Sequence, residues 1–166
     1  MLFEISDSLR NYLISVFPEV EGDGWIEVMS GASAAGLPAE KLTLLLYAVH
    51  EAPLQRSEFK AVVEREAKLP PLALKLHYMI TFNSMDDEET QRRLARVLDA
   101  FHERPLLGPE FFDPALTDRL ANLAIQLRSP TAEELNHLWT ALKVGMRLAL
   151  YYEVNATLVK EEEEEA

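Results

Sequence analysis

Apolar and polar side chains alternate most clearly near the end of the chain, between Met146 and Val159. A period of two is typical of a strand with one buried face. At about 3.3 Å per residue this strand would reach roughly 40 Å, well beyond the usual length of about 5–6 residues. Either part of it projects beyond its own sheet, or two strands meet around a bulge. Shorter apolar runs predict further strands at 42–50, 74–82 and 120–127, with weaker candidates at 25–29 and 59–64.

Helices are predicted where apolar residues recur every three or four positions. The segments with this pattern are 6–17, 86–102 and 131–144. Ser6 or Asp7 is expected to cap the first helix, and Thr131 is expected to cap the third. Gly145 is expected to end the third helix, because glycine readily adopts the conformation that closes a helix.

The predicted helix at 86–102 opens with acids and continues with arginines, an order that the helix dipole favours. Glu88 and Glu89 each lie four residues before an arginine, so both are expected to form ion pairs. The buried stripe of this helix is predicted to consist of Leu94, Val97, Leu98 and Phe101.

Together these elements predict an α/β (α+β) fold, a single compact domain. Its mixed, mainly antiparallel sheet is flanked by about three helices and ends in a long C-terminal strand. A length of 166 residues suits one domain and is too short for two large ones. We therefore expect one domain over residues 1–160. The glutamates at 161–165 predict a disordered, solubilising acidic tail over 161–166.

The chain is acidic, with a formal net charge of −12. Removing the five glutamates of the tail leaves a net charge of −7 for residues 1–160. This balance argues against non-specific binding to nucleic acid or anionic membrane, because phosphate contacts need clustered cations. The absence of cysteine excludes a disulfide scaffold, a cysteine-ligated zinc site and a thiol nucleophile.

Targeting signals are not apparent in the sequence. The N-terminus lacks the basic and apolar regions of a signal peptide. The longest strongly apolar stretch, Leu42–Val49, is too short to span a bilayer, so we expect no direct membrane insertion. These features favour assembly in the cytoplasm.

The sequence contains no motif for a phosphate-binding loop, a zinc-protease helix or a serine nucleophile elbow. The four histidines show no close metal-ligand spacing, so hydrogen bonding within or beside the core is the favoured interpretation. The acids of Asp86–Glu89 suit a divalent cation, yet they also stand where a helix N-terminus favours acids. We predict no metal site, no cofactor and no catalytic residue.

Several polar residues beside apolar strands are candidates for an interface or a structural polar network. His50 and Glu51 end a predicted central strand, and Arg56 follows closely. A buried or interfacial Arg–Glu pair would be geometrically specific, whereas a pair at the rim of the sheet would contribute only about 0–1 kcal/mol. His50 can meet His77 only if their strands pair. The candidates are His50, Glu51, Arg56, His77, Arg147, Tyr151 and Glu153.

The order of several motifs resembles the cap, or tail-terminator, protein family of phage-tail-like contractile injection systems. The motifs are LLLYAVHE at 44–51 followed by Arg56, PPLALKLHYMIT at 70–81, DEE at 87–89, His102 with PLLG at 105–108, and EELNHLW at 133–139 followed by Arg147 and Tyr151. The resemblance runs from about residue 4 to residue 159.

The resemblance implies a structural protein and not an enzyme. It implies a homohexamer ring at the end of the particle distal to the baseplate, in contact with the inner tube protein and the sheath protein. Such a ring stops elongation of both and holds the extended sheath to the tube. The resemblance is compatible with a particle that is released and with one that is membrane-anchored.

Two alternative functions remain open at this point. One is an adaptor of the same fold that bridges the particle to a membrane or to another subunit. The other is a metal-dependent hydrolase that uses His50, His77 and the acids near residue 86.

Overall fold

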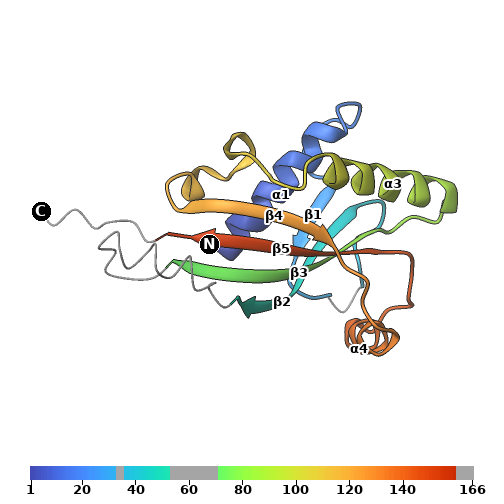
Figure 1. The fold of residues 1–166 in the computed structure, drawn as a ribbon. Coiled ribbons are helices and arrows are strands. Elements are labelled where there is room, and N and C mark those ends of the chain that lie inside the picture. The colour runs from blue at the N-terminus through green and yellow to red at the C-terminus, as the bar shows by residue number, and fades with distance from the viewer. Residues whose placement is uncertain (33–35, 53–70, 160–166) are drawn as a thin grey trace, which may run out of the picture.

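The computed structural model describes residues 1–32, 36–52 and 71–159. In these residues, five strands form one sheet of order β1-β2-β3-β5-β4. Helices α1 and α3 lie on one face of the sheet, and α4 lies on the other face near one end (Figure 1). The elements are α1 (Leu2–Val16), β1 (Ile26–Met29), β2 (Leu42–Glu51), β3 (Leu72–Phe82), α3 (Asp87–Glu103), β4 (Leu120–Leu127), α4 (Ala132–Leu142) and β5 (Leu150–Leu158).

The sheet is mixed and mainly antiparallel, as the sequence predicts. β1 and β2 are parallel, whereas β2–β3, β3–β5 and β4–β5 are antiparallel pairs. β5 lies between β3 and β4, so the last of the described strands joins the two halves of the sheet. The predicted strand at 59–64, the proposed tail at 161–166 and the boundary between tail and domain lie outside the described residues.

A β-bulge interrupts β2. Leu46 pairs with Tyr78 and Ala48 pairs with His77, so Tyr47 is an extra residue in β2. Because side chains alternate between faces along a strand, one extra residue reverses the alternation beyond it. Without the bulge, His50 would lie on the same face as Leu44; with it, His50 shares the opposite face with His77.

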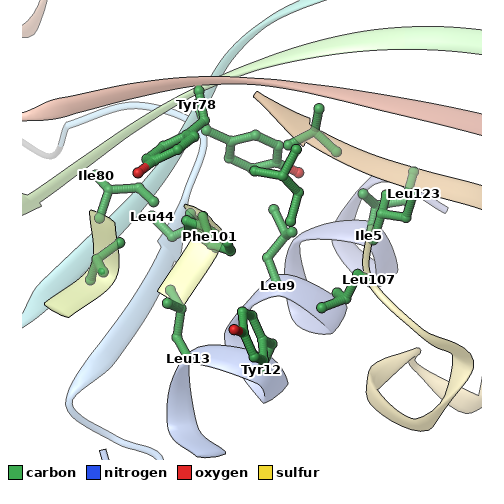
Figure 2. Close-up of a cluster of buried hydrophobic side chains, with 14 of the residues drawn as sticks. Ile5, Leu9, Tyr12, Leu13, Leu44, Tyr78, Ile80, Phe101, Leu107 and Leu123 are labelled. Atoms are coloured by element: carbon green, nitrogen blue, oxygen red, sulfur yellow. The ribbon is translucent and has the colours of Figure 1, made fainter. Parts of the chain in front are cut away.

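The main core lies between the sheet and the helices α1 and α3. Leu9 and Leu13 of α1 point toward the sheet, where Tyr78 of β3 packs, and Tyr12 of α1 contacts Phe101 of α3 (Figure 2). All five side chains are at most 5% exposed. Burial of each large apolar side chain contributes about 1.5–3 kcal/mol, so this cluster is the main source of stability.

Helix α1 begins at Leu2, one turn earlier than predicted, and Ser6 is not its cap. The fully buried Ile5 extends the apolar stripe toward the N-terminus, and the helix therefore begins before Ile5. The Ser6 hydroxyl donates to the carbonyl of Leu2 at 3.2 Å and also lies 2.8 Å from the Tyr78 hydroxyl. Ser6 therefore connects α1 to β3 instead of starting the helix.

The ends of the other two helices confirm part of the prediction. Asp86 caps α3 and Thr131 caps α4, each accepting a backbone hydrogen bond. Helix α4 ends at Leu142 and is followed by Lys143 in a left-handed conformation with φ 56°, so the prediction that Gly145 ends the helix is wrong. Leu98 of α3 is 37% exposed, so it is not part of the buried stripe.

The predicted ion pairs of α3 are confirmed. Arg92 and Glu88 are 2.6 Å apart, and the next pair along the helix is 3.1 Å apart. Arg93 of the second pair also lies over the rings of Trp25 and Phe82. Its guanidinium therefore contributes to packing as well as to charge pairing.

The C-terminal strand is shorter than the alternation predicts, because residues 146–149 do not join the sheet. The Thr81 hydroxyl donates to the carbonyl of Leu148 at 2.8 Å, and Arg147 donates to the side-chain oxygen of Asn83. These side-chain contacts take the place of strand pairing. Met146 and Leu148 are consequently 65% and 52% exposed.

Removing the hydroxyl from each of two buried tyrosines is expected to change the free energy of unfolding in different directions. The Tyr78 hydroxyl has Ser6 as its partner, whereas the Tyr152 hydroxyl is buried without a partner among the described residues. We expect Tyr78→Phe to lower the free energy of unfolding by about 1–2 kcal/mol. We expect Tyr152→Phe to be neutral or to raise it by up to about 1 kcal/mol, because an unpaired polar group leaves the core. Urea denaturation measures both free energies of unfolding. Equal losses in the two variants would contradict the difference in hydrogen bonding between the two hydroxyls.

Candidate functional site

A cavity of about 480 Å³ opens where β2 and β3 meet α4. Its lining is Tyr47, Ala48, His50, His77, Arg128, Glu134, His137 and Leu138. Three of the four histidines of the chain therefore line one cavity. We call His50, His77 and His137 the histidine cluster.

His77 lies at the centre of this arrangement. Its Nε2 atom is 3.2 Å from the Glu153 carboxylate on the adjacent strand β5. Its ring centroid is 5.0 Å from that of His50 and 6.1 Å from that of Tyr47, both on β2. The side chain of His77 is only 13% exposed. The bulge in β2 makes the contact possible, because it turns His50 onto the face that carries His77.

Arg128 connects the sheet to α4. One of its nitrogens donates to the Tyr47 hydroxyl at 3.0 Å, and another donates to the Glu134 carboxylate at 3.1 Å. The backbone N–H of Arg128 donates to the carbonyl of Tyr151, which extends the end of β4. This one residue therefore fixes the first turn of α4 relative to β2 and β5.

A second, smaller core lies beneath α4. Its buried members are Leu37, Leu45, Met79, Trp139 and Tyr151. The indole Nε1 of Trp139 donates to the Tyr151 hydroxyl at 2.9 Å. Trp139 is the buried residue of α4, so this indole anchors the helix to the sheet.

The environment of His77 sets its protonation. Burial lowers the pKa of His77 below its ordinary value, and the hydrogen bond to Glu153 partly offsets this effect. The positive charge of Arg128 also lowers the pKa of His77. The ring is therefore held in its neutral form in the folded protein, where one nitrogen can donate to Glu153.

Replacing Glu153 with glutamine tests this account of His77. We expect Glu153→Gln to move the titration of His77 to lower pH, because the carboxylate charge that favours the protonated ring is removed. NMR titration of the ring protons measures the shift. Glu133→Gln is the matched control, because Glu133 is exposed on α4 and does not line the cavity. A titration that stays unchanged in Glu153→Gln would contradict this account.

Comparison with protein families identifies the chain. The family model described as the Pvc16 N-terminal domain matches residues 4–166. The chain belongs to this family. The resemblance to cap proteins of contractile injection systems, inferred from the sequence motifs, is thereby confirmed. No curated protein matches the sequence.

Two solved structures share the fold of this Pvc16 N-terminal domain. The cap of the anti-feeding prophage, a tube-terminating cap, matches 100% of this chain with a TM-score of 0.62 and 18% identity. The sheath/tube terminator of the PVC extracellular contractile injection system, in its extended state, matches 95% with a TM-score of 0.51 and 15% identity. This chain covers 58% and 57% of those two chains, so it spans less than three fifths of their length.

The predicted site residues fall into separate groups in the Pvc16 N-terminal domain. The structure brings His50, His77 and Glu153 together at the cavity. Tyr151 lies beside them but is buried under α4. Glu51 is exposed at the end of β2.

Of the two remaining candidates, the structure describes only Arg147. Arg147 contacts Asn83, which directly follows the last residue of β3. Arg56 lies outside the described residues.

A metal centre finds no support in the part of the chain that the structure describes. No three histidine, aspartate or glutamate side chains there could hold one ion. Asp86 serves as the cap of α3 and does not line the cavity with His77. The hydrolase hypothesis therefore lacks the ligand set that it requires. Within the same residues, no helix is both long and apolar enough to cross a bilayer.

Several cavity residues were not selected from the sequence. Glu134, His137 and Leu138 stand at helical spacing, and that spacing is the signal that could have placed them on one face of α4. Tyr47 and Arg128 carry no comparable signal. Their contact depends on how the end of β4 meets the bulge in β2.

Proposed function

We propose that this chain is the cap domain that terminates the inner tube and sheath of a contractile injection system at the end distal to the baseplate. The observation that carries the proposal is the family match over residues 4–166. It is supported by the likeness of the whole chain to a tube-terminating cap and by the likeness to a sheath/tube terminator. The role is structural, without catalysis.

The proposed partners are the tube protein, the sheath protein and further copies of this chain in a ring, which we expect to be a homohexamer. The particle would assemble in the cytoplasm and function as an extracellular device. The adaptor alternative is not favoured by any observation on this chain. Because the solved relatives are longer, the proposal concerns the part of the cap that this chain covers.

Two neighbouring segments at one end of the sheet carry exposed apolar side chains, which suit a contact with another protein. Met85 is 98% exposed, and Met146 and Leu148 are more than half exposed. The hydrogen bonds from Thr81 to Leu148 and from Arg147 to Asn83 hold the two segments together. Exposed apolar side chains that gather at one place are typical of interaction sites.

Electron microscopy of reconstituted particles tests the proposal. Purified chain is mixed with tube and sheath subunits, and negative-stain images are scored for rings at tube ends and for tube length. We expect end-bound rings and shorter tubes than without the chain. A chain that remains monomeric and leaves the tube ends uncapped would overturn the proposal.

A pair of variants locates the contact. Met85→Glu combined with Met146→Glu is expected to reduce end binding, because a charge then enters each of the two segments. Leu98→Glu is the control, since Leu98 is a partly exposed apolar residue that flanks the buried stripe of α3. Both proteins should retain the thermal stability of the wild type, so that loss of binding reports on the surface.

A further inference from the structure

Helix α4 is attached to the sheet by few interactions. Trp139 is its buried side chain, while Leu135, Leu138 and Leu142 are only partly buried. The contact between Arg128 and Glu134 lies near solvent, because the Glu134 side chain is 50% exposed. An element with little buried surface opens at low free-energy cost compared with the rest of a domain. The same helix forms one wall of the cavity that holds His77.

We propose that the histidine cluster makes the docking of α4 pH-dependent, so that the helix detaches from the sheet in mildly acidic solution. This inference is independent of the proposed function. Detachment would uncover the second core, including Leu45, Met79 and Tyr151. The domain would therefore present an additional apolar surface under acidic conditions.

Charged and titratable groups face His77 from every neighbouring element. Strand β2 contributes His50 and the Tyr47 hydroxyl, and β5 contributes Glu153. The segment before α4 contributes Arg128, and α4 itself contributes Glu134 and His137 to the cavity wall. On β3, Lys75 lies two residues away on the same face and pairs in register with His50.

These groups do not cancel on protonation. Glu153 favours the charged form of His77, while Arg128 and His50 disfavour it. The Glu134 carboxylate is already paired with Arg128. Protonation of the mostly buried His77 ring therefore adds positive charge beside Arg128 in the cavity between α4 and the sheet.

The direction of the effect follows from the burial of His77. The pKa of His77 is lowered from 6.5, mainly by burial, so the docked form binds fewer protons than a form in which water reaches the ring. Above the ordinary pKa both forms are neutral at this site, and docking keeps its full stability. As the pH falls below about 6.5, the detached form takes up protons first and docking weakens.

Fluorescence of Trp139 provides a direct test. The chain contains two tryptophans, so the full-length Trp25→Phe variant leaves Trp139 as the sole reporter. Trp25 Nε1 has no hydrogen-bond partner among the described residues, so phenylalanine removes no hydrogen bond there. We expect acrylamide quenching of Trp139 to rise about two- to threefold between about pH 8 and about pH 5. Far-UV circular dichroism should show that the sheet remains folded.

Variants assign the effect to the cluster. His77→Gln in the same background is expected to flatten the pH dependence, because glutamine does not titrate. His102→Gln is the matched control, since His102 is exposed on α3 at the opposite face of the sheet. Hydrogen exchange of residues 132–142 in the wild-type protein, compared with residues 87–103, gives a second readout. The proposal would be overturned if neither the quenching of Trp139 nor the exchange protection of residues 132–142 relative to residues 87–103 changes with pH. A pH dependence that persists in His77→Gln would also overturn it.

Discussion

Replacing Tyr151 with aspartate is expected to lower the free energy of unfolding by about 3 kcal/mol or more, because a carboxylate is buried without a partner. Tyr151 is 8% exposed and packs between Met79 and Trp139. Its hydroxyl accepts the hydrogen bond from Trp139, which aspartate is too short to preserve. Burial also raises the pKa of the Tyr151 hydroxyl, so the native residue remains neutral there.

The control for this substitution is Tyr151→Phe, which keeps the ring and removes only the hydroxyl. We expect a loss of about 1 kcal/mol, because Trp139 is left without its acceptor. Urea denaturation gives both values. If Tyr151→Asp instead yields a stable monomer that no longer caps tubes, Tyr151 belongs to an interface and not to the second core.

Phe101→Ala is expected to cost about 3–5 kcal/mol of unfolding free energy, because it leaves a cavity at the centre of the main core. The ring of Phe101 contacts Tyr152 at a centroid distance of 4.9 Å and Tyr12 at 5.9 Å. Tyr12 also donates a hydrogen bond to the carbonyl of Ala100 at 2.7 Å. Loss of the ring therefore loosens α1, α3 and the sheet together.

Leu98→Ala is the matched control on the same helix. Leu98 is 37% exposed, so its truncation removes less buried surface, and we expect a loss of about 1 kcal/mol or less. Calorimetry distinguishes the two variants through their melting temperatures. Equal losses would mean that the Leu98 side chain, at the edge of the buried stripe, is packed as tightly as the Phe101 ring at its centre.

The alternation of side chains predicts the centre of the sheet well. In β3 the apolar set from Leu74 to Phe82 faces the main core as expected, because a strand that buries one face must place apolar residues at every second position. The α3 boundaries follow from similarly local signals, an acidic first turn and the cap at Asp86. These features depend on neighbouring residues, so the sequence contains them directly.

Features that depend on distant contacts were less predictable. The bulge at Tyr47 leaves no local signature, yet it decides that His50 meets His77. The alternating run from Met146 suggested a longer strand, but Thr81 and Asn83 engage its first residues from another part of the chain. The coverage of Tyr151 by α4 likewise depends on the position of Trp139 in space.

The position of β5 between β3 and β4 has a consequence for synthesis of the protein. While the chain is still on the ribosome, β3 and β4 each expose a strand edge that, among the described strands, only β5 covers. Exposed edges pair readily with other chains, so the nascent domain is open to aggregation until β5 has emerged. A stop codon ahead of Leu150 would therefore separate the sheet into two parts instead of merely shortening it.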